Sequence, residues 1–229
     1  MATAIIGLGN IGTQVALNLI AGGQPVIVAD HGPTRAEEFA KGSGGKSRAL
    51  SVPAAIDEAD IILFAVYFDA TKGLLAEYRN KLAGKIVVDP SNPIGPDGSG
   101  GFKKLIPQDQ SSGQILASLL PPGAKLVKAF GTLAAPSLKT GARRSPEPNV
   151  LFYASDDRAA GNAVAELIKA SGFAPVRIGG LDQSIRIEVF GDLHEFGKLG
   201  KLVTAKEASA LIWAAARSPH VIRTRRQRR

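Results

Sequence analysis

The sequence predicts an α/β protein in which helices cover both faces of a doubly wound, mainly parallel sheet, followed by a small C-terminal helical extension. Three observations lead to this fold class. Short apolar runs typical of buried strands alternate with helical runs through the first 180 residues. The first apolar run leads directly into a glycine-rich turn. The 45% apolar content includes no long uncharged stretch, as expected of a globular chain with a substantial core.

The first strand, residues 4–6, runs into a turn that matches G-x-G-x-x-G and precedes a helical run over residues 13–21. Gly7 allows a sharp turn, Gly9 allows a pyrophosphate to approach the backbone, and Gly12 allows the helix to pack closely on the sheet. An ordinary structural turn could contain the same glycines, but the flanking strands and helix favour dinucleotide binding. The expected cofactor-binding residues here are Gly7, Leu8, Gly9, Asn10, Ile11 and Gly12.

The second strand, residues 26–29, ends at Asp30, where an acidic side chain can bind the adenosine ribose. A carboxylate there repels a 2′-phosphate and favours NAD. His31, Thr34 and Arg35 follow at once and could instead donate hydrogen bonds to a 2′-phosphate. In the alternative interpretation, Thr34 is the N-cap of the next helix and Arg35 lies on its exposed face. The choice between NAD and NADP therefore stays open.

Further strands are expected at residues 48–50, 60–66, 85–89, 125–130, 149–154 and 175–178, and helices at 69–82, 112–120 and 158–171, the last capped by Asp156 or Asp157. Ligands bind at the carboxyl ends of such strands. Val66 ends the strand at 60–66 and Tyr67 follows it, where Tyr67 could pack on the cofactor, cover the site or pack in the core. Asn92 and Pro93 lie in a stiff loop that could position a nicotinamide or be an ordinary proline-rich turn.

Small residues follow the strand at 125–130, where they would let a flat ring approach the backbone. In this segment Thr132 could hydrogen-bond a carboxamide, and Ala135 ends the run. Residues 95–101 contain four glycines and are expected to be mobile.

Three regions are expected. Residues 1–180 form the dinucleotide-binding domain, residues 181–216 form a cap that completes the substrate cleft, and residues 217–229 form a basic tail. The cap includes a closing helix over residues 206–216, with Trp213 on its apolar side. Six arginines of the tail account for most of the net charge of +8. Since no aromatics are interleaved with them, we expect a solvated or disordered tail, and nucleic-acid binding is the lesser alternative.

Composition restricts the chemistry. The chain has no cysteine and only three, widely separated histidines, so no thiol chemistry and no metal site are expected. No Ser-His-Asp arrangement and no P-loop are present. Hydride transfer fits this scarcity, because the bound rings carry the reactive atoms. If a proton donor is needed, His194 and Tyr67 are the candidates, although His194 is more often a surface or packing residue. The early first strand leaves no room for a signal peptide, and no membrane span is present, so we expect a cytoplasmic location.

Four separated blocks resemble the NADPH-dependent F420 reductase family, which comprises F420H2:NADP oxidoreductases and their bacterial relatives. The blocks are Gly7 to Gly12, Asp89 to Pro93, Val127 to Thr132 and Leu151 to Asp157, and the resemblance covers about residues 2–200. It implies a Rossmann-type fold and hydride transfer between NADP and the deazaflavin F420, or in relatives a flavin or metal-reducing partner. It further implies that Gly9, Asn10 and Ile11 contact the pyrophosphate, that Asn92, Pro93, Thr132 and Ala135 flank the nicotinamide, and that the protein is a homodimer.

Two positions depart from the family pattern. Bacterial relatives often carry Asn-Ser-Arg-Gly-Pro after the second strand, whereas this chain has Asp30-His31-Gly32-Pro33, so the usual phosphate-binding arginine is absent. Arg35 could substitute for it, or the protein could use NAD. Gly131 stands where relatives tend to have His or Asn.

The leading hypothesis is an NADP-dependent oxidoreductase with F420 or a flavin as the second redox ring. The alternatives are a redox-sensing NAD(P)-binding module without turnover and a reductase of a small imine, ketone or ferric substrate.

Overall fold

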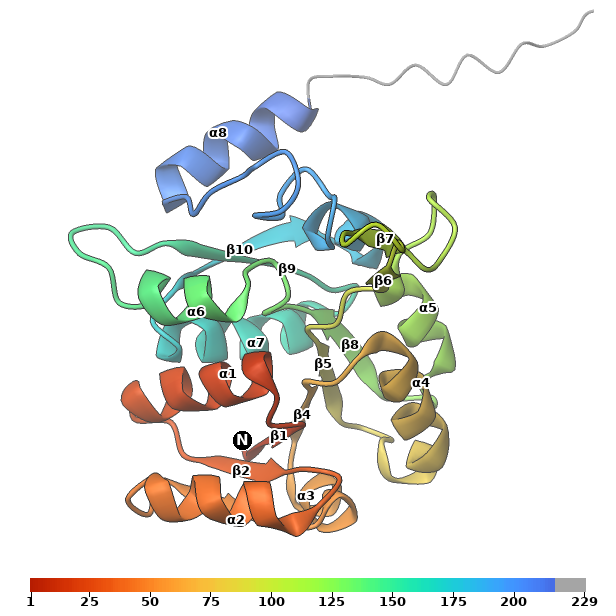
Figure 1. Ribbon diagram of the computed structural model, residues 1–229, viewed down its shortest axis with the longest axis vertical. Helices are drawn as coiled ribbons and strands as arrows, with labels where there is room; N and C mark the ends of the chain where they lie inside the picture. The colour runs from red at the N-terminus through yellow and green to blue at the C-terminus, as the bar shows by residue number, and fades with distance from the viewer. Residues whose placement is uncertain (217–229) are drawn as a thin grey trace, which may run out of the picture.

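The computed structural model describes residues 1–216 (Figure 1). The strands in chain order are β1 (Thr3–Ile6), β2 (Val26–Ala29), β3 (Ser47–Ala49), β4 (Ile61–Phe64), β5 (Ile86–Asp89), β6 (Ile94–Pro96), β7 (Phe102–Lys104), β8 (Lys125–Lys128), β9 (Val150–Ala154) and β10 (Ala174–Gly179). The α-helices are α1 (Asn10–Ala21), α2 (Pro33–Gly42), α3 (Val52–Glu58), α4 (Phe68–Glu77), α5 (Ser112–Leu119), α6 (Ala135–Gly141), α7 (Arg158–Ala170) and α8 (Ala205–Ala216). Two 3-10 segments are η1 (Arg79–Lys81) and η2 (Leu181–Ile187).

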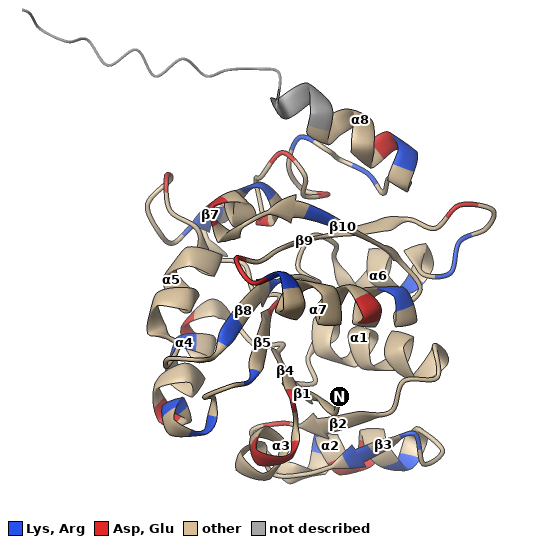
Figure 2. Cartoon of the chain, turned by 180° about the vertical axis from the view of Figure 1, so that it is seen from behind, with Lys and Arg blue, Asp and Glu red and all other residues tan. Residues whose placement is uncertain are grey.

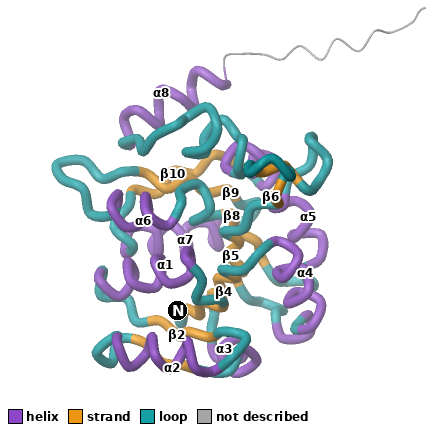
Figure 3. Tube along the Cα trace, viewed as in Figure 1, coloured by secondary structure: helices purple, strands orange, loops and turns teal. Residues whose placement is uncertain are grey.

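Eight strands form the main sheet in the order β10-β9-β8-β5-β4-β1-β2-β3, and the tube in Figure 3 shows helices around it. The pairs from β3 through β8 are parallel. The strands β9 and β10 are parallel to each other, but β9 meets β8 in an antiparallel bridge between Lys128 and Ala154. The prediction of a mainly parallel sheet is therefore confirmed. From β1 the chain first adds β2 and β3 on one side, and then returns to add β4 and β5 on the other side. The carboxyl end of β1 is therefore the switch point where such folds bind ligands.

Successive residues of the central strands β1 and β4 alternate between two cores. Ile5 and Leu63 belong to one cluster together with apolar residues of α1, α6 and α7. Ile6 and Phe64 belong to the other cluster, which includes residues of α3, α4 and α5. Both faces of the sheet are thus covered by helices, which explains why the strands are apolar throughout.

Several element boundaries differ from the sequence prediction. Helix α1 begins at Asn10 instead of residue 13, directly after Gly9 as its N-cap. The N-cap of α2 is Gly32, so the alternative that Thr34 caps this helix is wrong. Helix α4 ends at Glu77, and the remainder of the predicted 69–82 helix is the short η1. Asp157 does cap α7, since its carboxylate accepts a hydrogen bond from the Ala160 N–H at 2.9 Å.

Residues 94–104 form a structure that the sequence did not predict. The strands β6 and β7 pair as an antiparallel hairpin. Residues 95–101, expected to be mobile, therefore include the end of β6 and the turn of this hairpin. The short helices α3 and α6 were likewise not predicted, and each carries a proline near its N-terminus.

After β10 the chain forms a strap, which we define as residues 181–204, and ends in α8. Leu193 and Val203 of the strap and Ala208 of α8 are buried against β9 and β10. None of the helices within residues 1–216 is long and apolar enough to cross a lipid bilayer. Figure 2 shows basic and acidic residues mixed over the coloured part of the chain. The predictions for the Trp213 side chain and for the tail at 217–229 fall outside the described residues.

Candidate functional site

The glycine turn has the geometry that its sequence predicts. Gly7 has a φ of +95°, and a Cβ there would lie 2.6 Å from the Ala65 carbonyl oxygen. A Cβ on Gly12 would lie 1.9 Å from the Gly7 carbonyl oxygen, so α1 approaches the turn as only glycine allows. A Cβ on Gly9 would meet nothing within 4 Å. Two of the glycines therefore fix the fold of the turn, and the third leaves open space beside it.

The N-terminus of α1 offers free backbone donors. The Thr13 N–H makes the bond that opens the helix, to the Gly9 carbonyl at 3.0 Å, and no side chain caps this helix end. The N–H groups of Asn10, Ile11 and Gly12 precede this bond, so they have no carbonyl one turn back. Together with the positive end of the helix dipole, these donors can bind a diphosphate. Leu8 is buried, while Gly9 and Asn10 are exposed.

Asp30 lies beside this turn and holds it. Its Oδ2 accepts a hydrogen bond from the Leu8 N–H at 3.1 Å, and its Oδ1 accepts one from the His31 N–H at 2.7 Å. Burial alone would raise the pKa of Asp30, but the His31 ring, these N–H groups and the nearby Arg35 together hold it below its usual value. Asp30 is therefore an anion at neutral pH. Arg35 contacts it at 3.4 Å, while the His31 side chain and Thr34 are largely exposed to solvent.

A second group of predicted residues meets at the ends of β5 and β8. The Asn92 Nδ2 donates to the Gly131 carbonyl at 3.0 Å, and its Oδ1 accepts from the Val189 N–H of the strap at 2.7 Å. The Glu195 N–H donates to the Thr132 carbonyl at 3.2 Å. Asn92 thus joins two strand ends to the strap. Pro93 is buried in the same loop.

Residues near the end of β4 are less closely engaged. Val66 is half-buried beside the glycine turn, since its Cγ1 would touch a Cβ on Gly7. Tyr67 is 87% exposed and precedes α4 as its N-cap, so the alternative that Tyr67 packs in the core is wrong. Its neighbour Phe68 takes the buried position instead.

His194 is buried in the strap, and both of its ring nitrogens contact backbone groups. Nε2 lies 2.9 Å from the Gly131 carbonyl, and Nδ1 lies 3.0 Å from the Phe196 N–H. Since the carbonyl can only accept and the N–H can only donate, this geometry assigns the neutral tautomer with the proton on Nε2. Burial lowers the pKa of His194, more than the Gly131 bond raises it. These contacts favour a packing role for His194 over proton donation.

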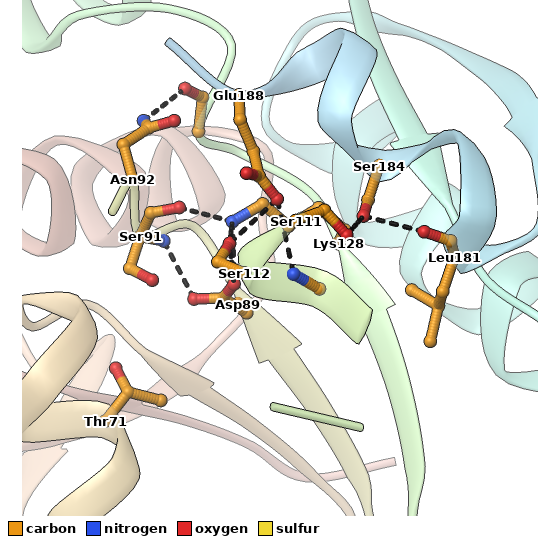
Figure 4. A network of polar contacts seen from close by, with 12 residues as sticks. Thr71, Asp89, Ser91, Asn92, Ser111, Ser112, Lys128, Leu181, Ser184 and Glu188 are labelled. Atoms are coloured by element: carbon orange, nitrogen blue, oxygen red, sulfur yellow. Dashed lines mark hydrogen bonds and ion pairs between the residues drawn. The ribbon is translucent and has the colours of Figure 1, made fainter. Parts of the chain in front are cut away.

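A buried polar network behind the ends of β5 and β8 was not predicted (Figure 4). Lys128 and Asp89 are 1% and 0% exposed, and the Lys128 Nζ donates to the Asp89 Oδ2 at 2.6 Å. The same ammonium donates to the Ser91 carbonyl and to the Ser112 Oγ. Ser112 in turn donates to Glu188 of the strap at 2.9 Å. The network therefore fixes the backbone of the loop that carries Asn92.

Two buried hydroxyls at these strand ends have no hydrogen-bond partner. They are the Ser91 Oγ and the Thr132 Oγ1. Buried hydroxyls are normally hydrogen-bonded, and these two have hydrogen-bonding capacity that the described residues leave unused. A nicotinamide carboxamide offers both a donor and an acceptor. The free donors of α1 fit the pyrophosphate of a dinucleotide, and these hydroxyls fit its nicotinamide end.

The described residues contain no cluster of potential metal ligands. Within residues 1–216, no group of three or more His, Asp and Glu side chains is placed to hold a metal ion.

The site combines the glycine turn, Asp30 and the parallel strand ends at the switch point. This combination is typical of Rossmann-type NAD(P)-binding proteins. Residues 2–93 match the family described as "NADP oxidoreductase coenzyme F420-dependent". A solved hypothetical protein of Sinorhizobium meliloti is 31% identical, with a TM-score of 0.77, and the match covers 89% of this chain and 95% of that chain. The chain belongs to the F420-dependent NADP oxidoreductase family, a family of NADP-dependent oxidoreductases.

Two named relatives differ in how much of their length this chain covers. The F420-dependent NADP reductase of Methanothermobacter marburgensis is 27% identical over 201 residues, which cover 82% of this chain and 88% of the reductase. The metalloreductase STEAP3 of Rattus norvegicus is 28% identical over 184 residues, which cover 80% of this chain. The match spans only 35% of the length of the rat protein.

Proposed function

We propose that the protein transfers a hydride between NADP(H) and a second bound redox ring, either coenzyme F420 or a flavin. The observation that carries this proposal is the placement of two unpartnered buried hydroxyls, on Ser91 and Thr132, along the same sheet edge as the glycine turn. A dinucleotide bound at the turn can extend along this edge. The name of the Methanothermobacter relative supports F420 as the second ring.

The chain's own residues would bind, orient and shield the rings. The N–H groups at the start of α1 would bind the pyrophosphate, and the Ser91 and Thr132 hydroxyls would bind the carboxamide. Asn92 would keep the strap against the strand ends and so exclude water from the nicotinamide end. The dinucleotide, when bound, supplies the hydride.

Reduction of a small imine or ketone is supported less well. Such a reaction needs a proton donor near the nicotinamide. Both ring nitrogens of His194 contact backbone groups, and Tyr67 is 87% exposed. Transfer between two rings makes no such demand on these side chains.

The acceptor can be identified by mixing purified protein with NADPH or NADH and each of F420, FMN, FAD and ferric chelates under anaerobic conditions. We expect F420 or a flavin to be reduced. The reaction is monitored by the absorbance changes of the nucleotide and of the acceptor. Tight NADPH binding without reduction of any acceptor would refute turnover and favour the redox-sensing alternative. Reduction of ferric chelates alone would refute the two-ring proposal.

A matched pair of variants tests the nicotinamide site. Thr132→Val removes a buried hydroxyl without a partner, so we expect stability to be unchanged or slightly higher while cofactor affinity falls about tenfold, the worth of one hydrogen bond. Thr3 is the control, because its Oγ1 is also buried and unpartnered. It lies at the amino end of β1, whereas the glycine turn follows the carboxyl end. Thr3→Val should leave affinity unchanged. Equal affinities for the two variants would refute the placement of the carboxamide at Thr132.

A further inference from the structure

A groove of about 650 Å³ lies beside the glycine turn. One wall is the turn and the first residues of α1. The opposite wall is the start of α6, with Ala135, Pro136 and Lys139, and Arg35 of α2 also lines the groove. The groove therefore includes the free N–H donors of α1 and faces them with a second helix.

Helix α6 is fixed against α1 next to this groove. The buried Asn18 of α1 donates from Nδ2 to the Leu138 carbonyl at 2.9 Å, and the Leu138 side chain is fully buried. Lys139 follows Leu138 directly, so its backbone has a defined position relative to the phosphate-binding turn. Its side chain is exposed and makes no ion pair within residues 1–216.

The charges around the groove give Lys139 a particular role. Arg35 and Lys139 are the charged side chains that line it. Arg35 contacts the anionic Asp30 at 3.4 Å, so these two charges largely offset each other. The first turn of α1 carries no charged cap. Lys139 is therefore the uncompensated positive charge of a groove whose proposed occupant carries at least two negative charges.

We propose that Lys139 binds a phosphate group of the dinucleotide, across the groove from the glycine turn. This inference rests on the proposed function. A lysine suits the task, because its flexible stem can bring an ammonium to a phosphate without a fixed geometry. The phosphate is either the pyrophosphate, which NADH and NADPH share, or the 2′-phosphate, which only NADPH carries.

The test measures dissociation constants of NADPH and NADH, by nucleotide fluorescence, for the wild type and three variants. Lys139→Gln removes the charge, Lys139→Arg keeps it, and Lys41→Gln removes an exposed charge from α2 that does not line the groove. We expect Lys139→Gln to weaken binding about tenfold, as for the loss of a charged hydrogen bond. Lys139→Arg and Lys41→Gln should stay within about twofold of the wild type by the same scale.

The two nucleotides separate the sources of the phosphate. Equal weakening of NADH and NADPH by Lys139→Gln identifies the pyrophosphate, whereas weakening of NADPH alone identifies the 2′-phosphate. Either result supports the inference. Affinities for Lys139→Gln equal to those for Lys41→Gln would overturn it and leave the proposed function intact. Failure of the wild type to bind either nucleotide would overturn both.

Discussion

Substitution of Lys128 by Met tests how strongly the buried network holds the strand ends. Met nearly preserves the length of the side chain but removes all three ammonium bonds, to Asp89, Ser91 and Ser112. Asp89, fully buried, then has no opposite charge. Breaking one side of such a pair costs ~3–5 kcal/mol. For a chain of this size each kcal/mol lowers Tm by roughly 2–4 °C. We therefore expect a decrease of ~6–20 °C.

Urea unfolding followed by circular dichroism, with a thermal scan, measures this effect. The matched control is Lys169→Met, because Lys169 also contacts a carboxylate, that of Glu166, at 2.7 Å but is 58% exposed. An exposed pair contributes only about 0.3–0.5 kcal/mol. If Lys128→Met and Lys169→Met lose the same free energy of unfolding, burial is not what makes the Lys128 pair important, and the reasoning fails.

Two other substitutions have defined outcomes. Gly12→Ala places a Cβ 1.9 Å from the Gly7 carbonyl. We expect this overpacking to lower the free energy of unfolding by roughly 1–3 kcal/mol and to abolish NADPH binding in a titration. The control Gly73→Ala, with open space around its Cβ, should change neither stability nor binding. Because the pKa of His194 is lowered on folding, the unfolded chain takes up a proton first as pH falls below about 6.5. The wild type should then lose stability below that pH and His194→Gln should lose less, in urea titrations at several pH values; parallel pH profiles would contradict the lowered pKa of His194.

The glycine turn was predictable because its signals are local. Gly7, Gly9 and Gly12 follow a strand and precede a helix within a single short stretch of the chain, and each has a separate steric reason. The same is true of Asp30, which directly follows β2. Strand ends in a parallel sheet also meet at one edge, so Asn92 and Thr132 could be placed near each other from the order of strands alone.

The buried network could not be predicted in the same way. A lysine at the end of an apolar strand is usually exposed, and nothing near Lys128 in sequence indicates that Asp89 lies beside it in the next strand of the sheet. Glu188 is more distant still, because it reaches Ser112 only after the strap folds back. The one available signal was that Asp89 and Lys128 are charged residues within strands expected to be buried. Helix α6 was missed because its short sequence, with Pro136 and few apolar residues, has little helical pattern.

The Gly131 carbonyl receives two hydrogen bonds, from the Asn92 amide at 3.0 Å and from the His194 ring at 2.9 Å. A carbonyl oxygen has two lone pairs, so both are in use. A nicotinamide bound against this backbone would meet an acceptor that is already saturated. Its carboxamide N–H groups could therefore not donate to the Gly131 carbonyl. The Ser91 and Thr132 hydroxyls, each able to donate or accept a hydrogen bond, would then be the groups that orient its carboxamide.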